Sequence, residues 1–319
     1  MESEIAYDFP PMARIYKDGR VERLMGTATV PASLDEKTGV NSKDIVISPE
    51  SGLSARLYIP KLPGSTGVPR KLSLLVYFHG GGFIIESTQS PAYHNYLNAL
   101  VSEAEVVVVS VEYRRAPERP LPVAYDDCWA ALGWVGFHAN GQGPEEWLNL
   151  FADLDRVFLS GDSAGANIAH NIAVRHGAEK IDGIGLSGII LVHPFFWGTE
   201  PVGSESSEAE VRDRVAAIWK FVSPGSVDGV DDPLMNPGKD PKLSGLGCSR
   251  VLVWVAEQDF LKDRGWYYGE VLRKSGWGGE VEVVETKGEN HVFHLFYPTC
   301  DNAVDMMKRV VAFLDEDKK

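Results

Sequence analysis

Short runs rich in β-branched and apolar residues recur along this chain at wide intervals, and this spacing is the strongest constraint on its fold. From the third run onward the intervening segments are long enough for crossover helices, and several runs are apolar throughout. Such strands are typical of a parallel sheet that is buried on both faces. The first two runs lie close together across a turn at Ser51 and Gly52, which indicates an antiparallel hairpin at the sheet edge. The predicted strands are Asp44–Ser48, Ala55–Pro60, Leu72–Phe78, Val106–Tyr113, Arg156–Ser160, Gly188–His193, Val251–Ala256 and Val281–Glu285.

Two segments between these runs have helical patterns. Leu121–Phe137 carries apolar residues on one face, and Ala164–Arg175 begins a helix of small residues directly after a strand. No repeat, low-complexity tract or linker separates two cores. We therefore expect a single α/β domain over residues 1–319, with an eight-stranded, mostly parallel sheet and helices on both faces.

Two further segments do not follow the alternation of strands and helices, and we interpret them as a cap over one end of the sheet. They are residues 1 to about 40 and residues about 195 to 245; surface decoration without a cap function is the alternative. The second segment contains a capping box from Ser207 to Glu210. A helix is predicted after it, with an apolar stripe at Val211, Val215, Ile218 and Val222.

The charge balance narrows the classes of partner. The chain has 45 acidic and 31 basic residues, a formal net charge of −14, which argues against nucleic acid and anionic membranes as partners. Its longest apolar runs are far shorter than the roughly 20 residues of a membrane span. The acidic start of the chain does not resemble a signal peptide, so we expect a cytoplasmic protein. We also expect a monomer or weak homodimer whose partner is a small molecule.

The three cysteines, Cys128, Cys248 and Cys300, have no short spacing and are expected to be reduced thiols.

The segment Gly161-Asp162-Ser163-Ala164-Gly165 matches Gly-x-Ser-x-Gly. It follows a predicted strand and precedes a predicted helix, which is the context in which this motif holds a nucleophilic serine on a sharp turn. The helix N-terminus behind the serine favours developing negative charge. The sequence therefore predicts Ser163 as a nucleophile.

A serine nucleophile needs a base, and three histidines follow it at a suitable distance. His193 ends a strand with no acid in a matching loop before it, and His294 falls one helical turn into the next segment. His291 follows the last predicted strand and a polar loop. We predict His291 as the base, since the order Ser, acid, His is that of serine hydrolases with an α/β sheet.

The acid that orients the base is expected after the preceding strand. Asp259 is the first carboxylate placed to turn back toward the histidine loop, and Glu257 and Asp263 are its competitors. Asp259 is preferred because the other two fit solvated or structural loop acids.

A glycine triplet completes the predicted chemistry. His79-Gly80-Gly81-Gly82-Phe83 directly follows the third predicted strand, where backbone N–H groups can converge on a substrate oxyanion. Its predicted oxyanion hole comprises Gly80, Gly81, Gly82 and Ala164, with the N–H groups of the last three as the principal donors.

No cofactor or metal is expected. Gly183-Ile184-Gly185-Leu186-Ser187-Gly188 matches a dinucleotide-binding pattern, but it precedes its strand, so no helix N-terminus is available for a pyrophosphate. The pair of His291 and His294 has no evident third metal ligand.

Taken together, these motifs resemble the hormone-sensitive-lipase branch of the α/β-hydrolases, and within it the plant carboxylesterases, over nearly the whole chain. One departure is Arg115, where relatives usually have leucine. The segments that carry the resemblance are Ile15–Arg23, His79–Phe83, Tyr113–Glu118 with Pro122–Asp127, Gly161–Asn167, Asp259 and His291.

The resemblance implies a carboxylesterase that acts on small apolar or aromatic esters through a Ser-His-Asp triad and an acyl-enzyme. Two other functions occur in the same group. Gibberellin receptors keep the serine and lose the histidine, whereas His291 is present here. The 2-hydroxyisoflavanone dehydratases carry threonine at the nucleophile position, so Ser163 favours hydrolysis over a lyase or cyclase reaction.

An apolar substrate pocket is expected beside the oxyanion loop and the cap. For each predicted residue, the alternative interpretation is that it packs in the hydrophobic core. These residues are Ile84, Ile85, Phe195, Phe196, Trp197 and Trp219.

Overall fold

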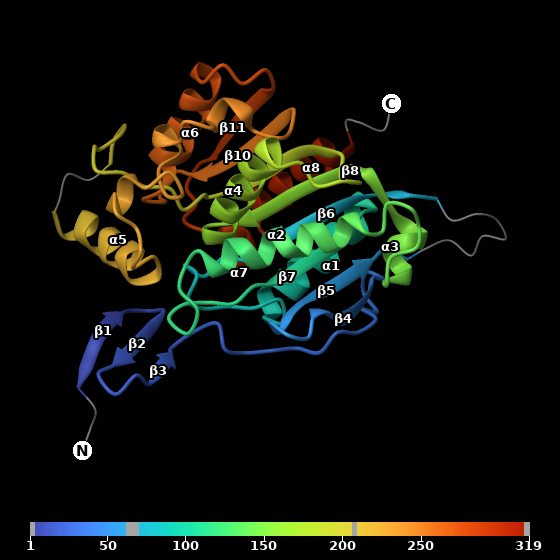
Figure 1. Cartoon of the computed structure of the whole chain (residues 1–319), viewed down its shortest axis with the longest axis horizontal. Coiled ribbons are helices and arrows are strands. Elements are labelled where there is room, and N and C mark those ends of the chain that lie inside the picture. Colours follow the sequence, from blue (N-terminus) through green and yellow to red (C-terminus); the bar gives the residue numbers. More distant parts are fainter. Residues whose placement is uncertain (1–3, 62–69, 206–208, 316–319) are drawn as a thin grey trace.

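A computed structural model describes residues 4–61, 70–205 and 209–315. Its main feature is a twisted eight-stranded sheet (Figure 1), and all eight predicted strands are confirmed within a few residues of their predicted ends. In spatial order the strands are β11 (Glu280–Thr286), β10 (Arg250–Ala256), β9 (Leu186–Val192), β8 (Ala152–Asp162), β6 (Leu72–Phe78), β7 (Val107–Glu112), β5 (Leu53–Ile59) and β4 (Asn41–Ser48).

The sheet is parallel from β11 to β7 and antiparallel at one edge. β5 pairs antiparallel with both β7 and β4, as the hairpin prediction requires. All seven residues of the central strand β6 are buried, with Leu74, Val76 and Phe78 in one core layer and Leu75 and Tyr77 in the other. This alternation between two cores explains why the strand is apolar at every position except Ser73, which is also buried.

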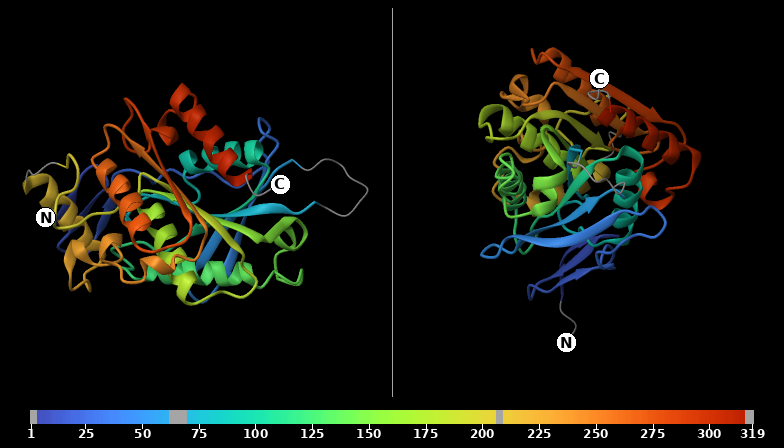
Figure 2. Two further views of the ribbon diagram at one scale, coloured as in Figure 1. Left: turned by 90° about the horizontal axis from the view of Figure 1, so that it is seen from above. Right: turned by 90° about the vertical axis from the view of Figure 1, so that its right-hand side faces the viewer.

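Helices cover both faces of the sheet (Figure 2, left view). The layer with α1 and α8 is one core, and the layer with α2, α4 and α6 is the other. The helices are α1 (Pro91–Ala104), α2 (Val123–Gly136), α3 (Glu146–Phe151), α4 (Ala164–Ala178), α5 (Ala209–Val222), α6 (Lys262–Lys274), α7 (Phe293–Phe296) and α8 (Asp301–Asp315), with short 3-10 turns η1 (Gly229–Asp231), η2 (Pro237–Lys239) and η3 (Leu243–Gly245).

The N-terminal segment forms a separate antiparallel sheet that the sequence did not predict as strands. It comprises β1 (Ile5–Phe9), β2 (Ala13–Tyr16) and β3 (Val21–Arg23). These strands have three to five residues each, too few for a clear periodic pattern. β2 and β3 are joined by a turn at Gly19, which has φ of 87° and donates a hydrogen bond from its N–H to the Tyr16 carbonyl.

The small sheet lies beside α5 at one end of the molecule (Figure 1). Phe221 of α5 packs on Tyr7 and Phe9 of β1, with ring centroids 4.9 and 5.1 Å apart, and Arg214 donates a hydrogen bond to the Pro10 carbonyl. The helix expected in this region is present, whereas Ser207 of the predicted capping box lies outside the described residues. The two segments predicted to form a cap are therefore in contact.

None of the helices in the described part of the chain has both the length and the apolar character that are needed to cross a membrane. All three cysteines are free, and Cys128 and Cys248 are buried.

Candidate active site

The predicted site residues meet at the carboxyl ends of four parallel strands. The His79 loop follows β6, Ser163 follows β8, Asp259 follows β10 and His291 follows β11. Open α/β sheets bind their ligands at this edge, because loops after parallel strands converge there. Residues that are more than 200 positions apart in the chain are thereby brought to one place.

Ser163 occupies a strained turn between β8 and α4. Its φ of 53° and ψ of −117° are unfavourable for a residue with a side chain. The turn is held by a hydrogen bond from the Ser163 N–H to the Val192 carbonyl (2.9 Å), and the Ser163 carbonyl accepts from the Phe195 N–H (3.0 Å). A Cβ on Gly165 would lie 1.9 Å from the Phe78 carbonyl oxygen. The close approach of the turn to β6 explains why glycine is required there.

Asp259 and His291 form the hydrogen-bonded pair that the sequence predicts. The distance from His291 Nδ1 to Asp259 Oδ2 is 2.7 Å, and the carboxylate is almost fully buried while 27% of the imidazole side chain is exposed. Burial alone would lower the pKa of His291, but the charge and hydrogen bond of Asp259, with a smaller contribution from Asp162, raise it above its usual value. This arrangement leaves Nε2 of His291 as the atom that can accept a proton.

The competing residues have other partners. Glu257 accepts hydrogen bonds from Lys287 and the Gly288 N–H, and Asp263 accepts from Ser204. The His294 side chain is buried, packs edge-on against Tyr96, and has its pKa lowered to about 3 by burial. A histidine that stays neutral and enclosed is a core residue here.

The glycine loop after β6 approaches the nucleophile turn closely. Gly81 and Gly82 have φ of 97° and 61° and both line the cavity that Ser163 faces. A Cβ on Gly81 would lie 2.3 Å from the Ile85 carbonyl oxygen. The N–H of Gly80, however, donates to the Tyr93 hydroxyl at 2.8 Å. Gly80 is therefore corrected from oxyanion-hole member to an anchored neighbour, since its only N–H is already bonded.

The site opens into an apolar cavity of about 650 Å³, a size typical of small-molecule sites. Both parts of the expected cap contribute to its wall. The cavity is lined from the N-terminal side by Pro10, Pro11, Met12 and Met25; from the oxyanion loop by Gly81, Gly82, Ile85 and Glu86; from α5 by Glu210, Val211, Arg214, Val215 and Ile218; and elsewhere by Ala92, Tyr93, Asp162, Ser163, Phe195, Phe260, Leu261, His291, Val292, Leu295 and Phe296.

Only two of the six predicted pocket residues, Ile85 and Phe195, line this cavity. The other four are at most 2% exposed and belong to the core that includes the cap helix. Their pattern in the sequence could not distinguish the two roles, because a core and an apolar pocket select the same side chains. The four core residues are Ile84, Phe196, Trp197 and Trp219.

His193, the third histidine considered, lies directly beside the pair. Among the described residues, His193, Asp259 and His291 form the one group whose potential metal-ligating atoms lie within 4.8 Å of one another. Two of those residues already bond each other, and Nδ1 of His193 accepts the Val292 N–H at 2.8 Å. Burial keeps the pKa of His193 well below its usual value. A neutral ring whose Nδ1 is an acceptor carries its proton on Nε2, so neither nitrogen has a free lone pair for a metal.

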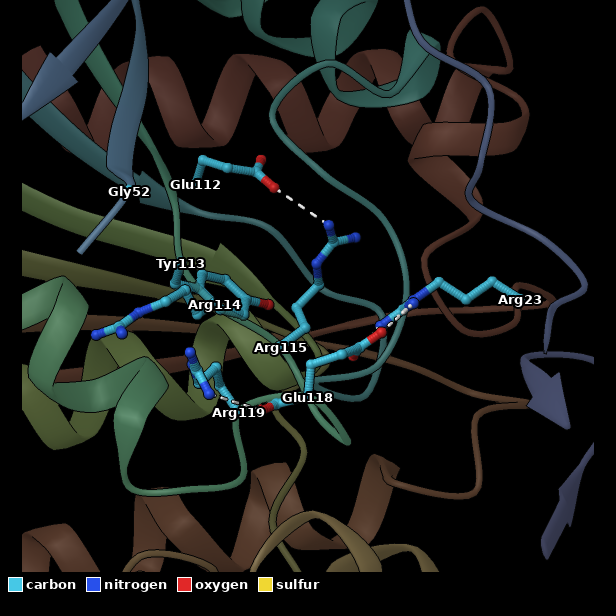
Figure 3. Close-up of a pocket in the computed structure, with 8 residues that line it drawn as sticks. All are labelled: Arg23, Gly52, Glu112, Tyr113, Arg114, Arg115, Glu118 and Arg119. Atoms are coloured by element: carbon cyan, nitrogen blue, oxygen red, sulfur yellow. Dashed lines mark hydrogen bonds and ion pairs between the residues drawn. The ribbon is translucent and has the colours of Figure 1, made fainter. Parts of the chain in front are cut away.

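Figure 3 shows a second hollow, of about 320 Å³, two of whose arginines bond to the loop after β6. Arg23 points toward Glu118 in this view and donates through Nε to the Ile84 carbonyl (2.7 Å), and Arg115 donates to the Glu86 carbonyl. Arg115, the departure from the plant pattern, thus supports the loop. The hollow is lined by Arg23, Gly52, Glu112, Tyr113, Arg114, Arg115, Glu118 and Arg119.

Comparisons with known proteins identify the family of this chain. A family model described as alpha/beta hydrolase fold matches residues 75–295. The chain is 50% identical to probable carboxylesterase 13 of Arabidopsis thaliana, with 100% of both chains covered. It is 46% identical to 2-hydroxyisoflavanone dehydratase of Glycyrrhiza echinata, covering 98% of this chain and 96% of that one. A solved thermostable carboxylesterase from a metagenomic library superposes with a TM-score of 0.70 at 27% identity over 90% of each chain. The chain therefore belongs to the α/β-hydrolase family, in the group that includes the plant carboxylesterases.

Proposed function

We propose that this α/β-hydrolase is a carboxylesterase that cleaves small apolar or aromatic esters through an acyl-enzyme on Ser163. The observation that carries the proposal is the 2.7 Å pair of Asp259 and His291, whose imidazole lines the same cavity as Ser163. A serine hydroxyl becomes a competent nucleophile only next to such a base.

In the acylation step, Ser163 Oγ attacks the ester carbonyl carbon and its proton passes to His291 Nε2. Asp259 stabilises the imidazolium through Nδ1. The N–H groups of Gly81, Gly82 and Ala164 donate to the oxyanion, each contributing about 3 kcal/mol to lowering the barrier. His291 then gives the proton to the leaving alcohol oxygen as the C–O bond breaks.

In the deacylation step, a water molecule attacks the acyl-enzyme while His291 accepts one of its protons. The tetrahedral intermediate collapses, the bond to Ser163 Oγ breaks, and His291 returns the proton to that oxygen. The products are a carboxylic acid and an alcohol. The chain's own residues supply every proton transfer, and we expect no cofactor.

The lining supports a substrate of moderate size and low polarity. Most side chains on the α5 side and on the His291 side of the cavity are apolar. We infer that one side takes the acyl group of the ester and the other its alcohol group. Among the described residues that line the cavity, Arg214 is the one Lys or Arg side chain, which is not a cluster of cations for an anionic substrate. Such a neutral ester is the expected partner of an acidic chain with a net charge of −14. A cytoplasmic location and a monomeric or weakly dimeric state remain predictions.

A lyase reaction is the second candidate, because a relative at 46% identity is named a dehydratase. Both reactions can use His291 as a base, but only hydrolysis requires Ser163 as nucleophile. Turnover of p-nitrophenyl acetate and butyrate that depends on Ser163 supports the esterase. Elimination of water from a hydroxylated substrate that persists in Ser163→Ala would instead support the lyase.

Ester hydrolysis is expected to rise with pH through the pKa of His291. The protonated imidazole cannot accept the serine proton, so activity is lost as the pH falls below that pKa. Because Asp259 raises this pKa, the midpoint of kcat/KM is expected above about pH 6.5. The profile for p-nitrophenyl acetate from about pH 5 to pH 9 measures it, and a flat profile up to pH 8 would contradict His291 as the base.

The cap, formed by residues 1 to about 40 and about 195 to 245 of the single domain, is proposed to select substrates. Val211 of α5 lines the cavity, so Val211→Phe should narrow it. We expect kcat/KM to fall about tenfold for p-nitrophenyl benzoate and to change little for the acetate. Val227→Phe is the control, because Val227 is 96% exposed and outside the lining. An equal loss for both esters would contradict a role in selection.

A further inference from the structure

The mechanism above leaves a buried carboxylate beside the nucleophile without a role. Asp162 precedes Ser163, is 1% exposed, and lines the cavity. Its two oxygens accept hydrogen bonds from two phenols, Tyr77 at 2.9 Å and Tyr93 at 2.8 Å. Burial raises the pKa of Asp162 to about 6, against the lowering effect of the two phenols. Asp162 is therefore ionised above that pH and acts as the acceptor of both bonds.

The two phenols differ in one respect. The hydroxyl of Tyr93, which donates its only proton to Asp162, also accepts the N–H of Gly80 at 2.8 Å. Tyr93 lies on α1, Gly80 in the loop after β6, and Asp162 at the end of β8. One hydroxyl thus joins three separate elements around the nucleophile. Tyr77, on β6, bonds only to Asp162 among these partners.

The loop packs so closely on Asp162 that no side chain fits at position 80. A Cβ on Gly80 would lie 2.3 Å from Asp162 Oδ2 and 3.0 Å from the Tyr93 hydroxyl. Gly80 immediately precedes Gly81 and Gly82, the loop donors assigned to the oxyanion. The position of Gly80 therefore sets where those two N–H groups point.

We propose that Tyr93 is a positioning residue that fixes the oxyanion loop, residues 79–86, to the nucleophile turn through its bonds to Gly80 and Asp162. The proposal rests on the proposed esterase function. Oxyanion stabilisation depends on donors that are already in place when the charge develops. Loss of the Tyr93 hydroxyl would free the Gly80 N–H and leave it unsatisfied in a buried place, so the loop would sample other positions.

Tyr93→Phe tests the proposal, with Tyr77→Phe as its matched control. Each variant removes one hydroxyl that donates to Asp162 and keeps the aromatic ring. Only Tyr93→Phe also removes the acceptor of the Gly80 N–H. For p-nitrophenyl butyrate we expect Tyr93→Phe to lower kcat about 10- to 100-fold, with KM within about threefold of the parent value. Tyr77→Phe should lower kcat by at most about threefold.

Hydrogen exchange supplies a readout that does not depend on turnover. Peptides that cover residues 79–86 should exchange faster in Tyr93→Phe than in the parent protein, and at the parent rate in Tyr77→Phe. Equal effects of the two variants on kcat and exchange, or no effect of Tyr93→Phe, would overturn the proposal. A parent protein that hydrolyses no ester would overturn the proposed function, and the exchange rates would still decide the role of Tyr93.

A second variant covers the case in which Tyr93→Phe does not accumulate as folded protein. Asp162→Asn keeps the bond between Tyr93 and Gly80 but replaces the anion that fixes the hydroxyl. A smaller fall in kcat, in the same direction and with faster exchange over residues 79–86, is expected. Unchanged kcat and exchange in this variant would count against the proposal.

Discussion

Replacing Ser163 by alanine is expected to abolish ester hydrolysis, with a fall in kcat on the order of 10⁵- to 10⁶-fold. The hydroxyl oxygen of Ser163 is the atom that forms the acyl-enzyme, and alanine has no atom that can replace it. The remaining rate would come from the oxyanion donors and from substrate binding alone.

Hydrolysis of p-nitrophenyl acetate and butyrate measures the effect of Ser163→Ala. A fluorophosphonate probe should label the parent protein and leave the variant unlabelled. Ser244→Ala is a suitable control, because Ser244 is exposed in η3. This turn packs against Gly177 near the C-terminal end of α4, whereas Ser163 precedes the N-terminal end of the same helix. Its activity and its thermal unfolding should match the parent. An alanine variant at 163 that keeps its activity would remove the nucleophile assignment.

Replacing Asp259 by asparagine is expected to lower kcat about 10⁴-fold. The asparagine can present its amide NH₂ to Nδ1 of His291 across the present 2.7 Å contact. The imidazole would then carry its proton on Nε2 and could not accept one from Ser163. Because the side chain keeps its size, and its oxygen can still accept the Leu261 N–H, folding should be little affected.

Asp263→Asn is the matched control for this change. Asp263 competes with Asp259 in the sequence but bonds Ser204 at the protein surface, so its variant should keep nearly full activity. The pH profile adds a second readout, since loss of the carboxylate removes the effect that raises the His291 pKa. Equal activity of the two variants would show that Asp259 does not orient the base.

Local sequence patterns predicted the strands of the main sheet. Apolar runs such as Leu72–Phe78, in which Ser73 is the exception, gave correct strand predictions because a strand buried on both faces is apolar at nearly every position. Ser163 stood out for a similar reason, since a strand, a turn between glycines and a helix are all encoded within about 20 residues. The three-stranded N-terminal sheet was missed because its strands are too short for a clear pattern. Its contacts with Phe221 join residues more than 200 positions apart.

The cavity and the loop anchors show the limit of local patterns. Trp219 and Phe196 are predicted from the sequence as pocket aromatics, yet they pack in the core. Which side of α5 or of a loop faces the cavity depends on how the cap packs on the sheet, and a local pattern does not specify this packing. Met12 and Met25 line the cavity without any signal in the sequence. Tyr93 gives no signal either, because its role depends on bonds to Gly80 and Asp162, 13 and 69 positions away.

By itself, the sequence determined the chain order of the eight strands in the main sheet, the strand-turn-helix context of Ser163, and the pairing of Asp259 with His291. These features depend on backbone preference and on residue spacing, which are local properties. The tertiary structure alone decided that Gly80 bonds Tyr93 and which apolar side chains border the cavity. Those outcomes depend on distances between segments remote in the chain, and such distances arise only when the sheet brings the ends of its strands together.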